Sequence, residues 1–276
     1  MQHKTMPQIL AHRALGFGYR ENTLRALKEA LFSDVHEIEL DFRLTKDNIY
    51  ICNHDPELKI KLKSGKIKRI MIRKKTIAEL NEKKKRVASL EEILAYFAVH
   101  KQDKIMNIDL KDCGEEKEVI KLVKKYKLNN SVIIISWLPK VLERIRRLDK
   151  KIKISFSYAP AKTHIFKILK RMKFDIRFSK SKKLFFVNKL NLNKFQKKQG
   201  KGYEHVHIFY QLPKKLIALK LDSINIPWYL VNKDVVREAH KQNIKVRVFS
   251  VDSKKQLQKL KGKKIDTIFT NEIYEL

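Results

Sequence analysis

Residues 37–55 read EIELDFRLTKDNIYICNHD and contain two strand-like stretches in immediate succession. Residues 37–44 alternate polar and apolar side chains, which is the period of a β-strand with two different faces. The turn at 45–48 is too short for a crossover between parallel strands, so 49–53 is predicted to return antiparallel as a hairpin. We therefore leave this return strand out when reading the order of the main sheet.

On both sides of the hairpin, strand-like and helix-like segments alternate along the chain of 276 residues. This order predicts eight strands joined mostly by helices, the pattern of an α/β (β/α)8 TIM barrel. A doubly wound open sheet is the alternative, but no strand leads into a Gly-x-Gly-x-x-Gly turn. The predicted strands are 9–12, 37–44, 105–110, 132–136, 152–156, 223–226, 245–251 and 266–270.

Two segments, 56–88 and 162–220, interrupt this alternation, and both are strongly basic. The chain has 63 Lys and Arg against 30 Asp and Glu, and the two segments carry 25 of the 33 net positive charges. We predict one domain over 1–276, with 56–88 as a small basic cap-like insertion after the His-Asp strand. The local charge favours an anionic partner, because a charged surface attracts ligands of opposite sign.

Composition excludes several other classes of protein. The two cysteines are too few for a disulfide framework or a cysteine-based zinc module. No apolar stretch approaches the length of a membrane span, and the first residues lack the layout of a secretion signal. We expect a cytoplasmic protein, and the sequence does not indicate an oligomeric state.

Ionisable side chains gather where the predicted barrel strands end, which is where barrel enzymes carry their active sites. The set combines carboxylates, histidines and two cationic side chains, each in a predicted strand or directly after one. Its members are His12, Arg13, Glu39, Asp41, His54, Asp109 and Lys111.

Three carboxylates inside one barrel would repel one another unless a cation lay between them. Mg²⁺ or Ca²⁺ is the simplest solution, since both prefer oxygen ligands. Arg13 and Lys111 suit a phosphate bridging to that metal, and two histidines beside it could act as general acid and general base. These residues by themselves indicate metal-assisted cleavage of a phosphoester.

Several motifs in a fixed order resemble the glycerophosphodiester phosphodiesterase family of phospholipase C-like TIM barrels. They cover most of the chain and are weakest over 56–88 and 160–220. The motifs are A-H-R at 11–13, E-N-T at 21–23, I-E-L-D at 38–41, T-K-D at 45–47, H-D at 54–55, N-I-D-L-K at 107–111, S-L-E-E-I-L at 89–94, S-W at 136–137, V-R-V-F-S-V-D at 246–252 and D-T-I-F-T-N at 266–271.

The resemblance implies an enzyme of lipid metabolism that hydrolyses glycerophosphodiesters to glycerol phosphate and an alcohol. It implies one divalent metal, a histidine acid–base pair, two phosphate-binding side chains and two acidic residues behind them. In that order the residues are Glu39, Asp41 and Asp109; His12 and His54; Arg13 and Lys111; and Glu21 and Asp55.

This sequence departs from the family pattern at three places. Ala14 stands where the family has a glycine, which matters only if the backbone there needs a positive φ or a close ligand approach. Asp109 replaces the usual glutamate and is shorter by one methylene. The stretch 249–252 replaces Trp-Thr-Val-Asn and is predicted to reshape the substrate pocket. Phe249 belongs to this stretch and is a candidate pocket residue. Trp228 and Tyr229, just after a predicted strand, either line a substrate pocket or simply pack.

Alternatives of function and partner remain open at this point. A lysophospholipase D or sphingomyelinase D-like lipid phosphodiesterase is one, and a catalytically weak barrel that binds anionic lipid or nucleic acid is another. Segments 56–88 and 162–220 suit an anionic membrane surface, so the enzyme could be peripheral there. A lysine bias of the genome would also produce basic residues. A nucleic-acid partner is disfavoured, because the barrel contains no recognisable nucleic-acid module.

Overall fold

The computed structural model describes residues 6–62, 64–82, 86–158, 218–229, 231 and 233–275. The predicted basic segment 162–220 lies outside the described residues except for 218–220.

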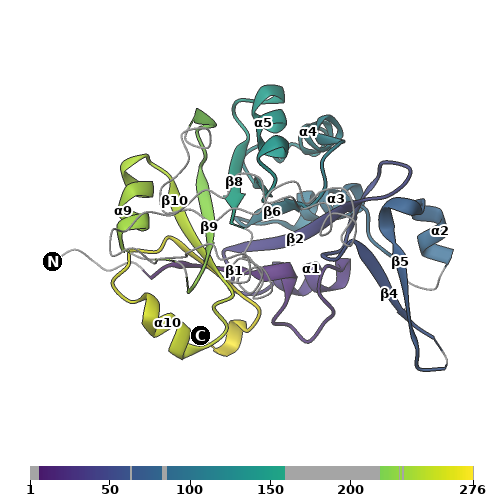
Figure 1. Cartoon of the computed structure of the whole chain (residues 1–276), viewed down its shortest axis with the longest axis horizontal. Helices are drawn as coiled ribbons and strands as arrows, with labels where there is room; N and C mark the ends of the chain where they lie inside the picture. The colour runs from purple at the N-terminus through teal and green to yellow at the C-terminus, as the bar shows by residue number, and fades with distance from the viewer. Residues whose placement is uncertain are drawn as a thin grey trace, which may run out of the picture.

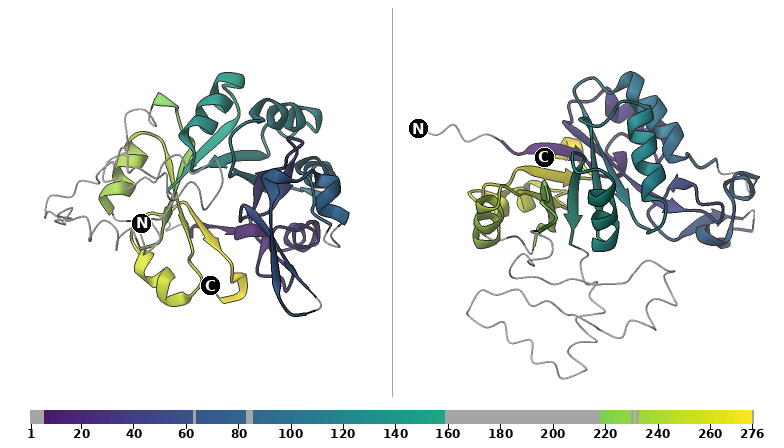
Figure 2. Two further views of the ribbon diagram at one scale, coloured as in Figure 1. Left: turned by 45° about the vertical axis from the view of Figure 1, so that its right-hand side comes forward. Right: turned by 90° about the horizontal axis from the view of Figure 1, so that it is seen from above.

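Nine strands form one sheet, and eight of them are parallel and close into a barrel, because the first strand pairs with both β2 and β11. The ninth strand, β3, is antiparallel to β2 and is the predicted hairpin return. The (β/α)8 TIM barrel is thereby confirmed (Figures 1 and 2). The sheet contains β1 (Gln8–Ala11), β2 (Glu37–Leu44), β3 (Tyr50–Cys52), β6 (Ile105–Leu110), β7 (Val132–Ser136), β8 (Lys153–Ser157), β9 (Ser223–Pro227), β10 (Lys245–Phe249) and β11 (Thr267–Thr270).

Helices surround the barrel and bury one apolar face each against it (Figure 2). Local sequence fixes where several of them begin: Thr23 accepts a hydrogen bond from Ala26, and Ser89 with Glu92 forms the reciprocal capping box. No helix in the described ranges has the length and apolar character needed to cross a membrane. The helices around the barrel are α1 (Leu24–Leu31), α3 (Leu90–His100), α4 (Glu116–Lys125), α5 (Pro139–Leu148), α9 (Lys233–Lys241) and α10 (Lys254–Leu260).

The alternation along β2 divides its side chains between two environments. Ile38 and Leu40 point outward into the apolar layer between strands and helices. Glu39 and Asp41 therefore point inward, since successive side chains of a strand lie on opposite faces. Both are almost completely buried. Because the apolar side chains of β2 pack outward against the helices, its acidic side chains lie in the barrel interior.

The insertion after β3 forms a compact unit at one side of the barrel. Hairpin β4 (Glu57–Lys61) and β5 (Ile67–Met71) projects there, and α2 (Ile77–Glu82) lies beside it (Figure 1). Leu58 and Leu80 belong to a small apolar cluster of their own, which anchors the unit to β3. The hairpin tip beyond this cluster is exposed to solvent.

Candidate active site

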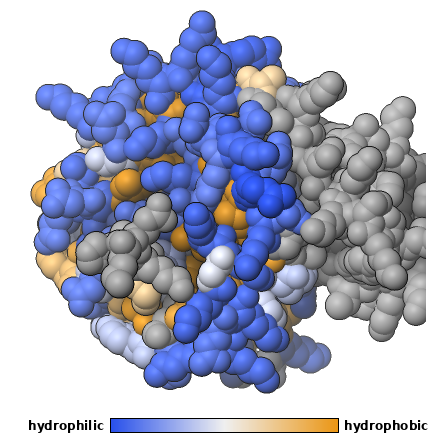
Figure 3. All heavy atoms as spheres, turned by 90° about the vertical axis from the view of Figure 1, so that its left-hand side faces the viewer, coloured by the Kyte–Doolittle hydropathy of each residue, from blue (hydrophilic) through white to orange (hydrophobic). Residues whose placement is uncertain are grey.

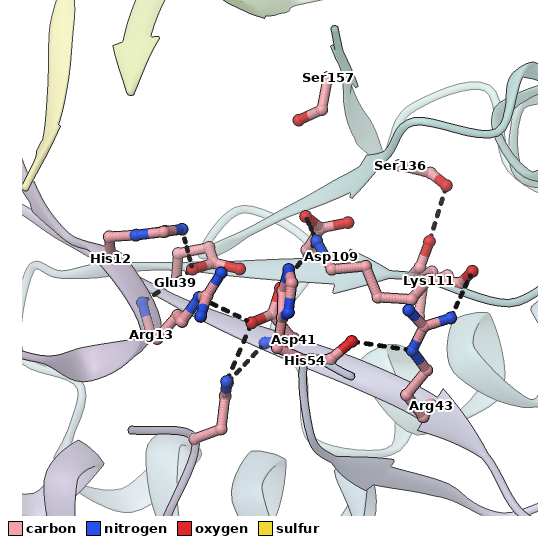
Figure 4. A network of polar contacts seen from close by, with 12 residues as sticks. His12, Arg13, Glu39, Asp41, Arg43, His54, Asp109, Lys111, Ser136 and Ser157 are labelled. Carbon is pink, nitrogen blue, oxygen red and sulfur yellow. Dashed lines mark hydrogen bonds and ion pairs between the residues drawn. The ribbon is translucent and has the colours of Figure 1, made fainter. Parts of the chain in front are cut away.

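Three carboxylates converge inside the barrel near the carboxyl ends of β2 and β6. The two strands pair in parallel, so that Asp41 lies directly opposite Asp109, and Glu39 precedes Asp41 on the same face. One carboxylate oxygen from each lies within 4.8 Å of the others (Figure 4). The strand register, rather than any loop, therefore sets the spacing of the three acids.

In the ranges that the structure describes, two buried oxygens of this cluster lack the hydrogen-bond partners that buried oxygens require. Glu39 Oε1 and Asp109 Oδ1 have no hydrogen-bond donor within the described part of the chain. Burial and the charges of Asp41 and Asp109 raise the pKa of Glu39 well above its usual range. Unpartnered buried oxygens of concentrated negative charge fit a hard divalent cation such as Mg²⁺ or Ca²⁺, which prefers oxygen ligands.

Lys111 stands beside this cluster. Its Nζ lies 2.8 Å from Asp41 Oδ1 and 2.5 Å from Asp109 Oδ2. Burial by itself would lower the pKa of Lys111, but Asp109 and Asp41 raise it above its usual value. The same ammonium opposes the effect of burial on Asp41 and, with His54 and Arg13, lowers the pKa of that carboxyl. Lys111 is therefore charged and Asp41 is ionised.

Arg13 joins β1 to the same carboxylates. Its backbone N–H donates to Glu39 Oε2 at 2.8 Å, its Nη1 lies 2.9 Å from Glu21 Oε2, and its Nε lies 3.3 Å from Asp41 Oδ2. Glu21 thus contacts the guanidinium at Nη1, while Asp41 contacts it at Nε. Because Glu21 and Asp41 hold the guanidinium in place, it is a preorganised donor for an anionic ligand.

The backbone after β1 is strained. Arg13 and Ala14 have φ values of 56° and 52°, in the left-handed region where a Cβ is unfavourable. Ala14 is buried and occupies the position where the family pattern has a glycine. The turn does need a positive φ there, and alanine adopts it at a cost of about 1–2 kcal/mol.

His12 approaches the carboxylates with one ring nitrogen. Its Nδ1 lies 2.9 Å from Asn271 Oδ1, and its Nε2 lies 3.9 Å from Glu39 Oε2. Burial, followed by the charge of Arg13, lowers the pKa of His12 to about 4. At neutral pH this imidazole is uncharged.

His54 follows the hairpin strand β3 after one intervening residue and lies near Asp41 (Figure 4). Its Nδ1 lies 3.0 Å from Asp55 Oδ1, and Lys59 Nζ lies 2.6 Å from Asp55 Oδ2. Burial lowers the pKa of His54, while Asp41 and the hydrogen bond to Asp55 oppose it. The seven residues predicted from strand ends are thus brought together, and Glu21 and Asp55 each contact one of them.

Two asparagines in this site were not assigned a role from the sequence. Asn22 donates to Asp41 Oδ2 at 2.9 Å and accepts from the Asp41 backbone N–H at 2.8 Å, so it clamps this carboxylate. Asn271 contacts His12. The sequence did contain a signal for each as a site residue, because Asn22 lies in the E-N-T motif and Asn271 directly follows a barrel strand.

The three predicted pocket residues lie in different surroundings. Trp228 packs toward α10, with Lys259 Nζ 5.2 Å from its ring centre, and Tyr229 is 55% exposed. Phe249 packs against the apolar cluster within the barrel, which includes Phe269. Among the described residues no hydrogen bond or ring contact joins these three to the acids. Their role in a pocket stays a prediction.

The sequence matches the Glycerophosphoryl diester phosphodiesterase family over residues 12–275. A curated relative, "Glycerophosphodiester phosphodiesterase" of Caldanaerobacter subterraneus, is 28% identical over 162 residues, which are 54% of this chain and 66% of the relative. The chain spans less than two thirds of the length of the first curated relatives that it matches, 66% and 58%.

Solved structures share the fold at low sequence identity. The structure of a putative glycerophosphodiester phosphodiesterase from Galdieria sulphuraria has a TM-score of 0.68 at 20% identity, covering 98% of this chain and 96% of that one. A phosphodiesterase of Oleispira antarctica, solved with the product sn-glycerol-3-phosphate, has a TM-score of 0.60 at 18% identity, covering 97% and 94%.

Proposed function

The chain belongs to the glycerophosphoryl diester phosphodiesterase family, and from that premise we propose that it hydrolyses glycerophosphodiesters to glycerol phosphate and an alcohol. The observation that carries the proposal is the group of three buried carboxylates that share unpartnered oxygens beside an arginine, a lysine and two histidines. The product bound to the Oleispira antarctica structure supports the same product class.

Glu39, Asp41 and Asp109 are the residues that would hold a divalent cation. When bound, Mg²⁺ or Ca²⁺ supplies positive charge that stabilises the phosphoryl oxygens in the transition state. Arg13 and Lys111 bind the same phosphate from the protein side, because both are held as cations next to the acids. These two side chains would therefore hold the phosphate beside the acidic cluster.

His12 and His54 are the two groups that move protons. In the first step one imidazole accepts the proton of the substrate hydroxyl that attacks the phosphorus, and the other, protonated when the anionic substrate binds, donates its proton to the oxygen of the departing alcohol, so that a cyclic phosphate forms. Water then opens the cyclic phosphate: the imidazole left neutral takes a proton from the water, and the imidazole left protonated returns its proton to the substrate oxygen. Each has one ring nitrogen engaged, by Asn271 or by Asp55, and this orients the ring. We expect His12→Ala and His54→Ala each to lower kcat by about 10²–10⁴-fold while substrate binding persists.

The proposal is tested with glycerophosphocholine and purified protein, with and without a chelator. We expect release of glycerol phosphate that stops on chelation and returns when Mg²⁺ or Ca²⁺ is added back. The matched controls are His12→Ala and His54→Ala at the same metal concentration. Unchanged turnover in the chelator, or in either variant, would contradict the proposed roles.

We also propose that the tip of hairpin β4–β5 contacts anionic lipid. Leu62 and Ile67 at this tip are 42% and 61% exposed, and Lys61 and Lys68 lie on the flanking strands. Exposed apolar side chains with lysines around them suit a negatively charged membrane interface. By contrast, the described surface over α9 and α10 is largely hydrophilic (Figure 3).

The hairpin is tied to the site in the middle of β4, because Lys59 pairs with Asp55 next to His54. Leu62 at the tip lies three residues further along the chain, roughly 10 Å at ~3.3 Å per residue, so the tip would dock the protein rather than contact the reacting phosphate. This arrangement keeps lysophospholipid open as a second substrate class, delivered from the surface on which the protein rests.

Sedimentation with phosphatidylglycerol vesicles tests the docking surface. Pelleting should fall with salt and should be lost in Leu62→Ser/Ile67→Ser, while hydrolysis of soluble glycerophosphocholine stays unchanged. Pelleting of the variant like the parent protein would refute the tip as the contact. Comparing micellar lysophosphatidylcholine with glycerophosphocholine distinguishes the lipid phosphodiesterase alternative, which requires the micellar substrate to be the faster one.

A further inference from the structure

Closure of the barrel brings the last strand beside the first one. β1 and β11 pair in parallel, with Ala11 opposite Thr270. The residues that follow, His12 and Asn271, therefore meet although 259 positions separate them, and His12 Nδ1 lies 2.9 Å from Asn271 Oδ1. No other hydrogen bond involves the His12 ring among the described residues.

Asp252 determines which end of the Asn271 amide faces His12. Asn271 Nδ2 lies 3.2 Å and 3.1 Å from the two oxygens of Asp252, and the Asn271 backbone N–H donates to Asp252 Oδ1 at 2.8 Å. An ionised carboxylate can only accept hydrogen bonds, so the amide NH2 must point toward Asp252. The amide oxygen is left for His12.

Asp252 is itself held in place. Its backbone N–H donates to Gln256 Oε1 at 2.6 Å, and Thr270 Oγ1 lies 3.4 Å from its Oδ1. Asp252 and Asn271 both lie just beyond the carboxyl ends of neighbouring strands, β10 and β11. The pair is therefore part of the barrel rim and not of a free loop.

We propose that Asn271 and Asp252 are positioning residues that keep the proton of neutral His12 on Nδ1. Since the amide oxygen can only accept, Nδ1 must donate, and the free electron pair of the imidazole lies on Nε2. Nε2 is the nitrogen turned toward Glu39, at 3.9 Å from its Oε2 and beyond hydrogen-bond distance. Nε2 is then the atom that exchanges a proton with the substrate. The catalytic part of this inference rests on the proposed function, whereas the tautomer does not.

The tautomer is measured first, by ¹H–¹⁵N correlation spectra of the Mg²⁺-loaded full-length protein with ¹⁵N-labelled histidine. His12→Gln assigns the signals. We expect His12 to be the Nδ1–H tautomer in the parent protein. In Asn271→Leu, which removes the acceptor at nearly constant size, we expect a shift toward the Nε2–H form.

Turnover of glycerophosphocholine is the second readout. Asn271→Leu should lower kcat by about 10–10³-fold, since a misplaced proton disables general acid–base catalysis. KM should change less than about twofold, because Asn271 touches His12 and not the phosphate. The matched control is Gln256→Leu, which loosens the same rim at Asp252 without changing any donor that faces Asn271, and it should keep the parent kcat.

Rescue separates a tautomer effect from loss of structure. In Asn271→Asp/Asp252→Asn the new carboxylate accepts from His12 Nδ1 and from the new amide at 252, so kcat should return to within about tenfold of the parent. An Nε2–H tautomer in the parent protein, or an unchanged tautomer and kcat in Asn271→Leu, would overturn the inference. If the parent protein cleaves no phosphodiester but shows the Nδ1–H tautomer, the proposed function fails and the tautomer assignment stands.

Discussion

The two ends of the barrel interior use the same strands to bury charge in different ways. At the amino end of β2, Glu37 meets the guanidinium of Arg247, and Asn107 donates to the same carboxylate at 2.8 Å. Arg247 also donates to Asn107 at 2.9 Å. One buried carboxylate thus faces one buried cation, with an amide that contacts both.

Two residues further along β2 the balance is different. Glu39, Asp41 and Asp109 share their space with two cationic side chains, Arg13 and Lys111, and keep oxygens without a donor. A buried charge without a partner is costly unless a ligand supplies one. Burial and charge alone therefore do not mark the site, whereas an unequal number of opposite charges does.

The largest effect on stability is expected at the amino end of β2, where the charges of Glu37 and Arg247 balance each other. Arg247→Met leaves Glu37 buried without its cation, so we expect the free energy of unfolding to fall by about 3–5 kcal/mol. Urea denaturation followed by circular dichroism measures it. The control is Arg247→Met/Glu37→Gln, which removes both charges and should recover most of the loss. A loss below about 1 kcal/mol in the single variant would show that the pair is not structural.

At the three carboxylates, removal of a charged side chain should instead raise the free energy of unfolding. Glu39→Gln removes a buried charge that has a backbone donor but, among the residues described, no cationic side chain paired with it, so the chelated protein should become more stable by about 1 kcal/mol. The affinity for Mg²⁺ or Ca²⁺ should fall at least about tenfold, because one anionic ligand is lost. Denaturation in a chelator and calorimetric metal titration measure the two quantities.

The stability gained in Glu39→Gln should depend on pH. The pKa of Glu39 is raised in the folded protein, so its ionisation opposes folding above the usual glutamate pKa near 4.5. The stability gained in Glu39→Gln should therefore be larger at pH 8 than at pH 5. Equal gains at both values, or a loss of stability in the chelated protein, would mean that Glu39 is paired within the chain.

The smallest effect is expected at the strained turn beside the site. Ala14→Gly relieves about 1–2 kcal/mol of left-handed strain, but glycine costs about 0.5–1 kcal/mol of chain entropy, so the net gain should be roughly 0.5–1 kcal/mol. Ala30→Gly, at a buried position in the last turn of α1, is the matched control and should destabilise by up to about 1 kcal/mol. A loss of stability in Ala14→Gly would contradict the strain.

Much of this molecule follows from local patterns. The period-two alternation in β2 predicted an inward row of acids, and the short turn after it predicted the antiparallel return of β3. The capping box at the start of α3 likewise joins Ser89 and Glu92, three positions apart. Each of these features depends on residues a few positions apart, whose geometry a strand or a helical turn fixes.

The sequence alone placed Glu39 and Asp41 on one face and His12 at the end of a strand, because a strand's own period decides which side chains share a face. Only the tertiary structure put Asn271 against His12, since closing the barrel pairs β1 with β11 across almost the whole chain. The same closure left more acids than bases at one end of the interior and an equal number at the other. Charge balance in a buried space is a property of all the strands that enclose it, so no single stretch of sequence contains it.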